Sequence, residues 1–147
     1  MLKKLAVGIL LLVAVTYQAE ARHRHHARPY VLVQAAVVGA SVSAQIVGGR
    51  PSGCPYAFCG CGVSLHIFGK IISSLNLAAN WLHFPRAEPA PGMVAVHPGH
   101  HHVLAIERVI DRNHVIAYDP NGGRHLTWLH ARSIAGWTVV NPHGGNG

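Results

Sequence analysis

Cysteine and histidine are the side chains of this sequence with the greatest capacity for chemistry. The chain has 147 residues, with 3 cysteines and 13 histidines but only 5 aspartates and glutamates. A thiolate is a strong nucleophile, and an imidazole moves protons near neutral pH. Hydrolysis by paired carboxylates, or a metal site made of oxygen ligands, would have to be built from those few acids. The composition therefore favours a cysteine nucleophile assisted by histidine.

Cys59 stands at the start of a predicted helix. Apolar residues recur at helical spacing from Phe58, and the pattern stops at Gly69, a residue typical of helix C-termini. Free N–H groups and the helix dipole stabilise an anion in the first turn. Gly60 and Gly62 each cost about 1 kcal/mol relative to alanine, but they let another backbone approach closely. The structural alternative is that Cys59 is an ordinary buried core residue.

A base and an orienting group follow further along the chain. His100, His101 and His102 precede an apolar run, and Asp119 and Asn121 close the next run. Side chains alternate along a strand, so His102 is the leading base, His100 is its geometric substitute and His101 faces the other way. Asn121 is the expected orienting residue and Asp119 the alternative, because Asn121 also begins a good Asn-Gly-Gly turn.

Helices followed by strands must position these groups. A second helix is expected after Ser73 or Ser74, with Leu75, Ala78, Trp81 and Leu82 on one side. A turn-rich connector at 85–92 leads to four strand-like runs, with a short hairpin connection at 111–113; the runs are 93–97, 102–110, 114–119 and 137–141. Helices first and an antiparallel sheet afterwards predict an α+β domain.

The N-terminal third of the chain has a different character. Lys3 and Lys4, the apolar run 5–15 and the Ala19-Glu20-Ala21 triplet predict a secretory signal peptide at residues 1–21, cleaved after Ala21. The run is shorter than the roughly 20 residues of a membrane span. Residues 22–50 comprise a basic His-rich arm and an apolar segment of small residues whose pattern does not distinguish helix from strand. We expect a secreted or periplasmic protein with no stable membrane span after processing and with its domain at 51–147.

The net charge of the chain indicates the class of partner that it would bind. The formal net charge is +7, so an exported chain would be attracted to anionic cell-envelope polymers rather than to nucleic acid.

Three cysteines leave one unpaired, and a Cys54–Cys61 disulfide that frees Cys59 is one solution. Cys59-x-Cys61 with His66 lacks the usual zinc spacing, so we expect no metal or cofactor.

Five segments, in order, resemble landmarks of the CHAP family, the cysteine, histidine-dependent amidohydrolases/peptidases of the papain-like superfamily. They are Phe58-Cys59-Gly60, Leu75-Asn76-Leu77-Ala78-Ala79-Asn80-Trp81, Pro89-Ala90-Pro91-Gly92, His101-His102-Val103 and Asn121-Gly122. Many members cut amide bonds in bacterial peptidoglycan. The resemblance covers about residues 51–142 and implies a papain-like α+β fold, with N-terminal helices carrying the cysteine and an antiparallel sheet carrying histidine and asparagine.

That resemblance implies a role for each candidate residue. Cys59 would be the nucleophile, His102 the general base and Asn121 the orienting residue of an amidase or endopeptidase that works through an acyl-enzyme. The Cys59 N–H would form half of an oxyanion hole, with Tyr56 a candidate for the other half. Trp81 would contact substrate, or else belong to the aromatic core. The alternative function is a non-catalytic exported protein that binds cell wall or, through its histidines, metal.

Overall fold

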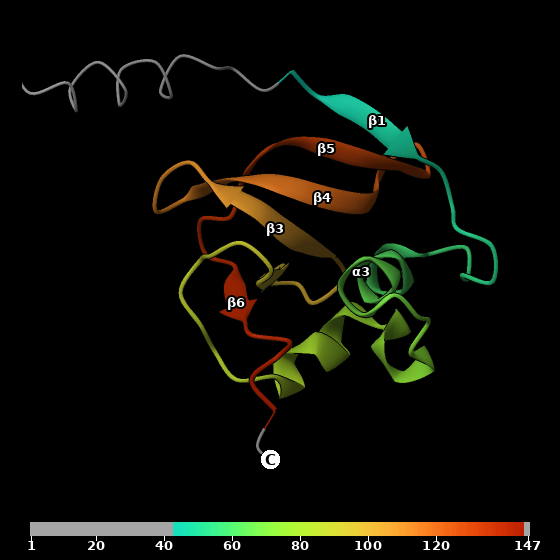
Figure 1. Ribbon diagram of the computed structural model, residues 1–147, viewed down its shortest axis with the longest axis horizontal. Coiled ribbons are helices and arrows are strands. Elements are labelled where there is room, and N and C mark those ends of the chain that lie inside the picture. The colour runs from blue at the N-terminus through green and yellow to red at the C-terminus, as the bar shows by residue number, and fades with distance from the viewer. Residues whose placement is uncertain (1–42, 146–147) are drawn as a thin grey trace, which may run out of the picture. The chain divides into compact units, whose positions relative to one another are not determined.

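The computed structural model describes residues 43–145 as a mixed α+β fold, which confirms the expected class (Figure 1). Its six strands form one antiparallel sheet in the order β1-β5-β4-β3-β2-β6. Their bounds are β1 Gln45–Gly48, β2 Val94–Val96, β3 Val103–Val109, β4 His114–Gly123, β5 Leu126–Ser133 and β6 Thr138–Val140. The expected signal peptide and His-rich arm lie outside the described residues.

The second predicted helix is instead two short 3-10 turns. These are η1, Ser73–Asn76, and η2, Ala78–His83. Leu77 between them is extended, with φ −84° and ψ 124°, and therefore interrupts any continuous helix. The Trp81 indole N–H donates to the Leu75 carbonyl oxygen at 2.9 Å, which holds the two turns together.

The first predicted helix is confirmed as α3, Cys59–Phe68, and it ends at Gly69 in the left-handed conformation with φ 68°. Its two glycines permit the expected close approaches. A Cβ at Gly60 would lie 2.1 Å from the Leu75 carbonyl oxygen, and one at Gly62 would lie 2.4 Å from Pro120 Cβ. The first turn of α3 therefore rests directly on η1 and on the end of β4.

Two strands extend the sheet beyond the four that the sequence predicts. β5 follows β4 through a tight turn at Arg124 and His125, both with positive φ. Buried and exposed residues do not alternate regularly along β5, so an alternating apolar pattern in the sequence does not predict this strand. β1 pairs with β5 at the sheet edge, so the sheet includes residues that precede position 51.

Apolar side chains fill both faces of the sheet. α3, η1 and η2 cover one face, where Val63 and Trp81 pack against strand residues including Val94, Val103 and Val140. On the other face Leu104, Ile106 and Val115 pack with Ile134 and the half-buried Trp137. Among residues 43–145, no helix is both long and apolar enough to cross a membrane.

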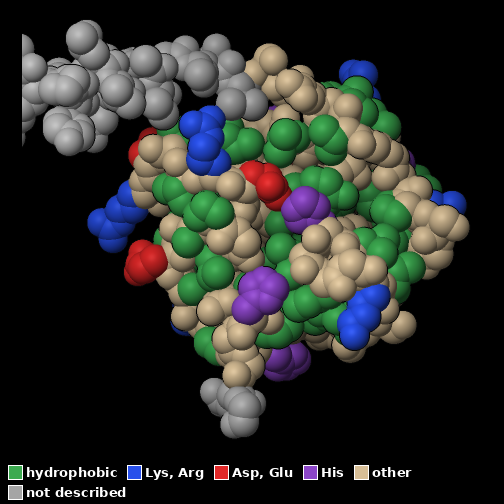
Figure 2. All heavy atoms as spheres, in the orientation of Figure 1, with side chains coloured by type: hydrophobic (Ala, Val, Ile, Leu, Met, Phe, Trp, Pro, Cys, Tyr) green, Lys and Arg blue, Asp and Glu red, His purple; other side chains and the backbone are tan. Residues whose placement is uncertain are grey.

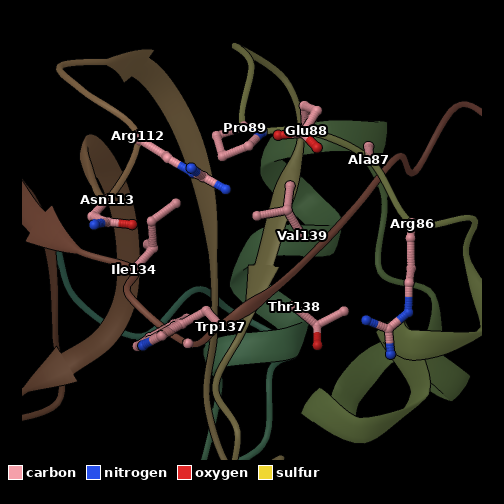
Figure 3. A pocket seen from close by; sticks show the side chains of 11 residues that line it. Arg86, Ala87, Glu88, Pro89, Arg112, Asn113, Ile134, Trp137, Thr138 and Val139 are labelled. Atoms are coloured by element: carbon pink, nitrogen blue, oxygen red, sulfur yellow. The ribbon is translucent and has the colours of Figure 1, made fainter.

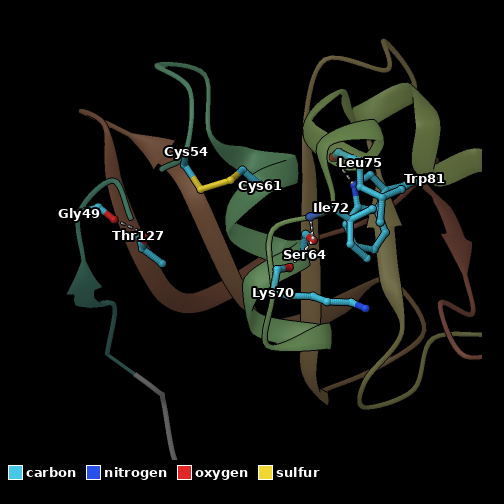
Figure 4. Close-up of a disulfide and its surroundings, with 9 residues drawn as sticks. All are labelled: Gly49, Cys54, Cys61, Ser64, Lys70, Ile72, Leu75, Trp81 and Thr127. Atoms are coloured by element: carbon cyan, nitrogen blue, oxygen red, sulfur yellow. Dashed lines mark hydrogen bonds between the residues drawn. A yellow bond between two sulfur atoms is a disulfide. The ribbon is translucent and has the colours of Figure 1, made fainter. Parts of the chain in front are cut away.

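Cys54 and Cys61 form a disulfide that ties the segment before α3 to the helix (Figure 4). The Cα atoms of the two cysteines are 5.7 Å apart, and both residues pack with Phe58 in a small buried cluster. This pairing was one solution to the odd cysteine count, and it is confirmed. Cys59, between the two bonded cysteines in sequence, is free.

Removing this disulfide is expected to destabilise the domain. Closing a loop across a sequence separation of 7 reduces the entropy of the unfolded chain by an amount worth about 2–3 kcal/mol. The Cys54→Ala/Cys61→Ala double variant should therefore unfold at lower denaturant concentration in an equilibrium titration. Wild-type protein in a reducing buffer is the control and should shift in the same direction. An unchanged midpoint in both samples would contradict the prediction.

Candidate active site

Cys59 is the first residue of α3 and is 5% exposed. Its backbone N–H belongs to the first turn, where helix N–H groups have no partner within the helix. Its thiol lies 3.9 Å from the carbonyl oxygen of His101, the residue before His102, and the interaction of the thiol with the His102 imidazole helps to raise the pKa of that ring. The fold thus places the free thiol at the positive end of a helix dipole and near an imidazole.

His102 lies between Cys59 and a buried carboxylate. Its Nε2 donates to Asp119 Oδ1 at 2.6 Å, so Nδ1 is the ring nitrogen left to meet the thiol. His102 immediately precedes β3, and Asp119 lies in the neighbouring strand β4. Asp119 is fully buried. A carboxylate that holds one imidazole nitrogen fixes the tautomer and orientation of the ring and stabilises its protonated form.

The second oxygen of Asp119 is held by β5. His130 Nε2 donates to Asp119 Oδ2 at 2.9 Å, and Arg132 Nε is 3.9 Å from the same oxygen. The chain after β4 also closes over the carboxylate, because a Cβ at Gly122 would lie 2.6 Å from Asp119 Cγ. The carboxylate therefore has partners on both oxygens and little room to rotate.

These contacts change the proton affinity of both partners. Burial acts to lower the pKa of His102, but the hydrogen bonds and charges of Asp119 and Cys59 outweigh it and raise the pKa to about 9. Burial acts to raise the pKa of Asp119, but the hydrogen bond and charge of His102, the hydrogen bond of His130 and the charge of Arg132 together lower it. At neutral pH the pair is an imidazolium beside a carboxylate.

Aromatic and basic side chains enclose the pair. The Trp137 ring stands edge-on to His102 with centroids 6.2 Å apart, and the Arg132 guanidinium lies 5.9 Å from the Trp137 ring centroid. His97 also packs edge-on against Trp137. Burial and the charges of His101, His102 and Arg132 lower the pKa of His97. Further protonation is thus disfavoured beside the His102 imidazolium.

A cleft of about 440 Å³ opens beside Cys59. Most of its lining is small and apolar, from Pro55, Ala57, Leu77, Ala78 and Ala79, while Asn76, His100 and His101 supply its polar groups. The described lining contains no lysine, arginine, aspartate or glutamate. A neutral acyl group can therefore approach the thiol across an apolar surface without burying a charge.

The structure separates Asn121 from His102. Continuing the pairing of β3 with β4 would put Asn121 opposite His102, but Asn121 has φ 59° and its side chain turns away. Asn121 Oδ1 accepts from His125 Nδ1 at 3.1 Å. Asp119, the alternative in the sequence analysis, makes the contact with His102 instead. A short asparagine tolerates the left-handed conformation that this turn requires.

The two expected substrate-binding residues also lie away from the cleft surface. Trp81 is fully buried, with its indole in the core between α3 and the sheet, so the core alternative is the observed one. Tyr56 is 70% exposed, and its ring packs against His125 with centroids 4.1 Å apart. Its neighbours Pro55 and Ala57 line the cleft, whereas Tyr56 is absent from the lining.

Sequence patterns assign no site role to three residues found here, although Asn76 lies within a segment that resembles a CHAP landmark. His130 and Arg132 lie on β5, a strand that periodicity does not reveal, and Asn76 lies in a turn that the sequence pattern joins to a helix. The spacing His130-x-Arg132 is the one available clue, since alternate residues of a strand share a face. The sequence does not give the register in which β4 pairs with β5. It therefore does not show that this face of β5 lies beside Asp119.

A second hollow, of about 340 Å³, lies away from Cys59 (Figure 3). Arg86 and Arg112 lie on opposite sides of it, Glu88 at its top and Trp137 at its lower edge. It contains no cysteine and no histidine. Within residues 43–145, no group of three or more histidine, cysteine, aspartate or glutamate side chains is arranged to hold a metal ion.

Comparison with known proteins adds no assignment: the chain matches no protein-family model, no curated protein and no solved structure.

Proposed function

We propose that this protein is an exported papain-like cysteine hydrolase, an amidase or endopeptidase that cleaves amide bonds of cell-wall peptidoglycan. The observation that carries the proposal is the grouping of Cys59, His102 and Asp119: the free thiol lies 3.9 Å from the His101 carbonyl oxygen, and the adjacent His102 imidazole donates to a buried carboxylate at 2.6 Å. A nucleophile, a base and an orienting group in this relation are the minimum for acyl transfer through cysteine.

In the first step the Cys59 thiolate attacks the amide carbonyl carbon. The new S–C bond forms as the C=O electron pair moves to oxygen, and the Cys59 N–H at the start of α3 donates to that oxyanion. The C–N bond then breaks, and the His102 imidazolium gives its proton to the departing nitrogen. The products of this step are a free amine and a thioester on Cys59.

In the second step water replaces the amine. His102, now neutral, accepts a proton from a water molecule whose oxygen attacks the thioester carbonyl. The S–C bond breaks, the carboxylic acid leaves, and the thiolate beside the imidazolium is restored. Asp119 keeps the imidazole in one orientation through both proton transfers.

The substrate class rests on the family resemblance and on charge. The exported chain, without Lys3, Lys4 and Glu20, would keep +6 of the formal charge of +7; this charge favours contact with an anionic envelope polymer, and the attraction should weaken as salt rises. On the face seen in Figure 2, lysine and arginine side chains stand singly among apolar and neutral groups. The overall charge, rather than one dense cationic patch on that face, would hold such a polymer near the cleft.

The test compares the purified protein with the same protein after iodoacetamide treatment. Cys59 is the one free cysteine, because Cys54 and Cys61 are bonded, so alkylation changes a single site. Each sample is incubated with peptidoglycan, with and without chelator, and new amino groups and peptides are measured by mass spectrometry. The untreated protein should release both, the alkylated protein neither, and chelator should have no effect.

Equal release by the two samples, or release by neither, would refute the cysteine-hydrolase proposal. Binding without cleavage that is lost in chelator would instead favour the metal-binding alternative.

A further inference from the structure

The oxyanion expected at Cys59 needs a second donor, and the cleft contains one side-chain amide. Asn76 lines the cleft together with Cys59. Its backbone touches the residue that follows Cys59, since a Cβ at Gly60 would lie 2.6 Å from the Asn76 carbonyl oxygen. The backbone of Asn76, in η1, therefore lies against α3 at the residue next to the nucleophile.

The hydrogen bonding of this amide is incomplete. Within residues 43–145, Asn76 Oδ1 is the one buried side-chain oxygen or nitrogen without a hydrogen-bond partner. A buried unpaired acceptor costs about 1–3 kcal/mol. The core makes no use of that oxygen, so its orientation requires another explanation. Asn76 Nδ2 is not among the buried unpaired atoms and donates to no described residue, so it is available to a group that enters the cleft that Asn76 lines.

We propose that Asn76 is the second oxyanion-hole residue, donating from Nδ2 to the same carbonyl oxygen to which the Cys59 N–H donates. This inference rests on the proposed function. It gives Asn76 the role in the oxyanion hole for which the sequence suggested Tyr56. An amide donor suits this place because it stays neutral and directed as negative charge develops on the oxygen. The ligand it recognises is the carbonyl of the scissile amide.

The experiment separates acyl transfer from simple thiol reactivity. p-Nitrophenyl acetate acylates a thiolate through a tetrahedral oxyanion, forming a thioester and releasing p-nitrophenolate. Iodoacetamide alkylates the same thiolate by displacing iodide, with no oxyanion. In Asn76→Ala the acylation rate of Cys59 should fall roughly 10²- to 10³-fold, the loss typical of one oxyanion donor. The alkylation rate should change less than about twofold, since it needs only the Cys59–His102 pair.

Asn80→Ala is the matched control. Asn80 lies four residues later, and its Nδ2 donates to the Ser74 carbonyl oxygen, so its amide is used in structure. This variant should lower the Tm and leave acylation unchanged, whereas Asn76→Ala should lower acylation and leave the Tm unchanged or higher. Asn76→Asp keeps the shape, loses the donor and adds a negative charge beside the oxyanion, so it should lower acylation at least as far as Asn76→Ala.

Three results would overturn the inference. Acylation of Asn76→Ala at the wild-type rate would show that the donor is elsewhere. A parallel loss of acylation, alkylation and Tm would make Asn76 a structural residue. A wild-type protein that is alkylated but never acylated would overturn the oxyanion hole itself. Failure of the wild type to cleave peptidoglycan, with acylation still dependent on Asn76, would refute the substrate proposal alone.

Discussion

Cys59→Ala is expected to lower peptidoglycan cleavage roughly 10⁴- to 10⁶-fold, because removing the nucleophile abolishes the acyl-enzyme path. Cys59 is small and packs beside Val63 and Leu75, so loss of its sulfur should destabilise the fold by only about 1 kcal/mol. Release of amino groups from peptidoglycan measures the activity, and circular dichroism on heating measures the fold.

Cys59→Ser is the companion variant, because it keeps the side-chain volume and the hydrogen-bonding position but replaces a thiolate with a weakly acidic hydroxyl. It should be nearly as inactive as Cys59→Ala while melting close to the wild type. Cleavage by either variant within about tenfold of the wild-type rate would exclude a cysteine nucleophile.

Asp119→Asn is expected to lower cleavage roughly 10³- to 10⁴-fold, since the amide neither fixes the productive tautomer of His102 nor stabilises the imidazolium. The wild-type rate should hold up to about pH 9 and fall above it, because the His102 pKa is raised to about 9 and the imidazolium must protonate the leaving amine. This fall in rate at high pH is the alkaline limb of the pH profile. In Asp119→Asn the pH of the alkaline limb should move down toward the ordinary histidine pKa of about 6.5. Rates measured from pH 5 to 10 test both statements.

The free energy of unfolding should also depend on pH, because it is linked to the protonation of His102. The pKa of His102 is higher in the folded state than in the unfolded state, so its stabilising contribution is complete below about pH 6.5 and disappears as pH rises through about 9. Urea unfolding should therefore show wild-type stability declining across this window by up to about 3 kcal/mol, since one pKa unit is worth about 1.4 kcal/mol. Asp119→Asn should show a much smaller decline.

His130→Gln is the matched control for that variant. It loses one partner of Asp119 Oδ2 but keeps the carboxylate and its 2.6 Å bond to His102. Cleavage should fall only about tenfold, and the alkaline limb should stay near pH 9. If Asp119→Asn and His130→Gln gave the same rates and the same pH profile, Asp119 would have no separate role in orienting His102.

The sequence was sufficient where a feature depends on neighbouring residues. Cys59, the apolar repeat after it and Gly69 specify α3, since helix spacing and a left-handed C-terminal glycine are local properties. The odd cysteine count offered the Cys54–Cys61 pairing as one solution, and the structure contains this disulfide. The strand containing Leu104 and Ile106 follows from its β-branched and apolar run.

Tertiary structure alone decided which polar groups meet. His102 contacts Asp119 instead of Asn121 because the chain leaves the regular ladder at Asn121, where φ is 59°. His130 reaches the same carboxylate because β5 pairs with β4 in a register that puts His130 opposite Ala117. Register and turn conformation depend on contacts between distant segments, which local sequence patterns do not encode.

Tertiary structure also decided that Trp81 is buried and that Asn76 lines the cleft. Trp81 is core because two short turns, rather than one helix, bring its indole N–H to the Leu75 carbonyl oxygen. Asn76 faces the cleft because Gly60 lets the backbone of η1 approach the start of α3. The sequence by itself pointed to Cys59 as the candidate nucleophile, to His102 as the leading candidate base, and to the helix and strand that bear them. The orienting carboxylate and the cleft arise only when α3, η1 and the β3–β4–β5 strands pack, because each is made by segments far apart in the chain.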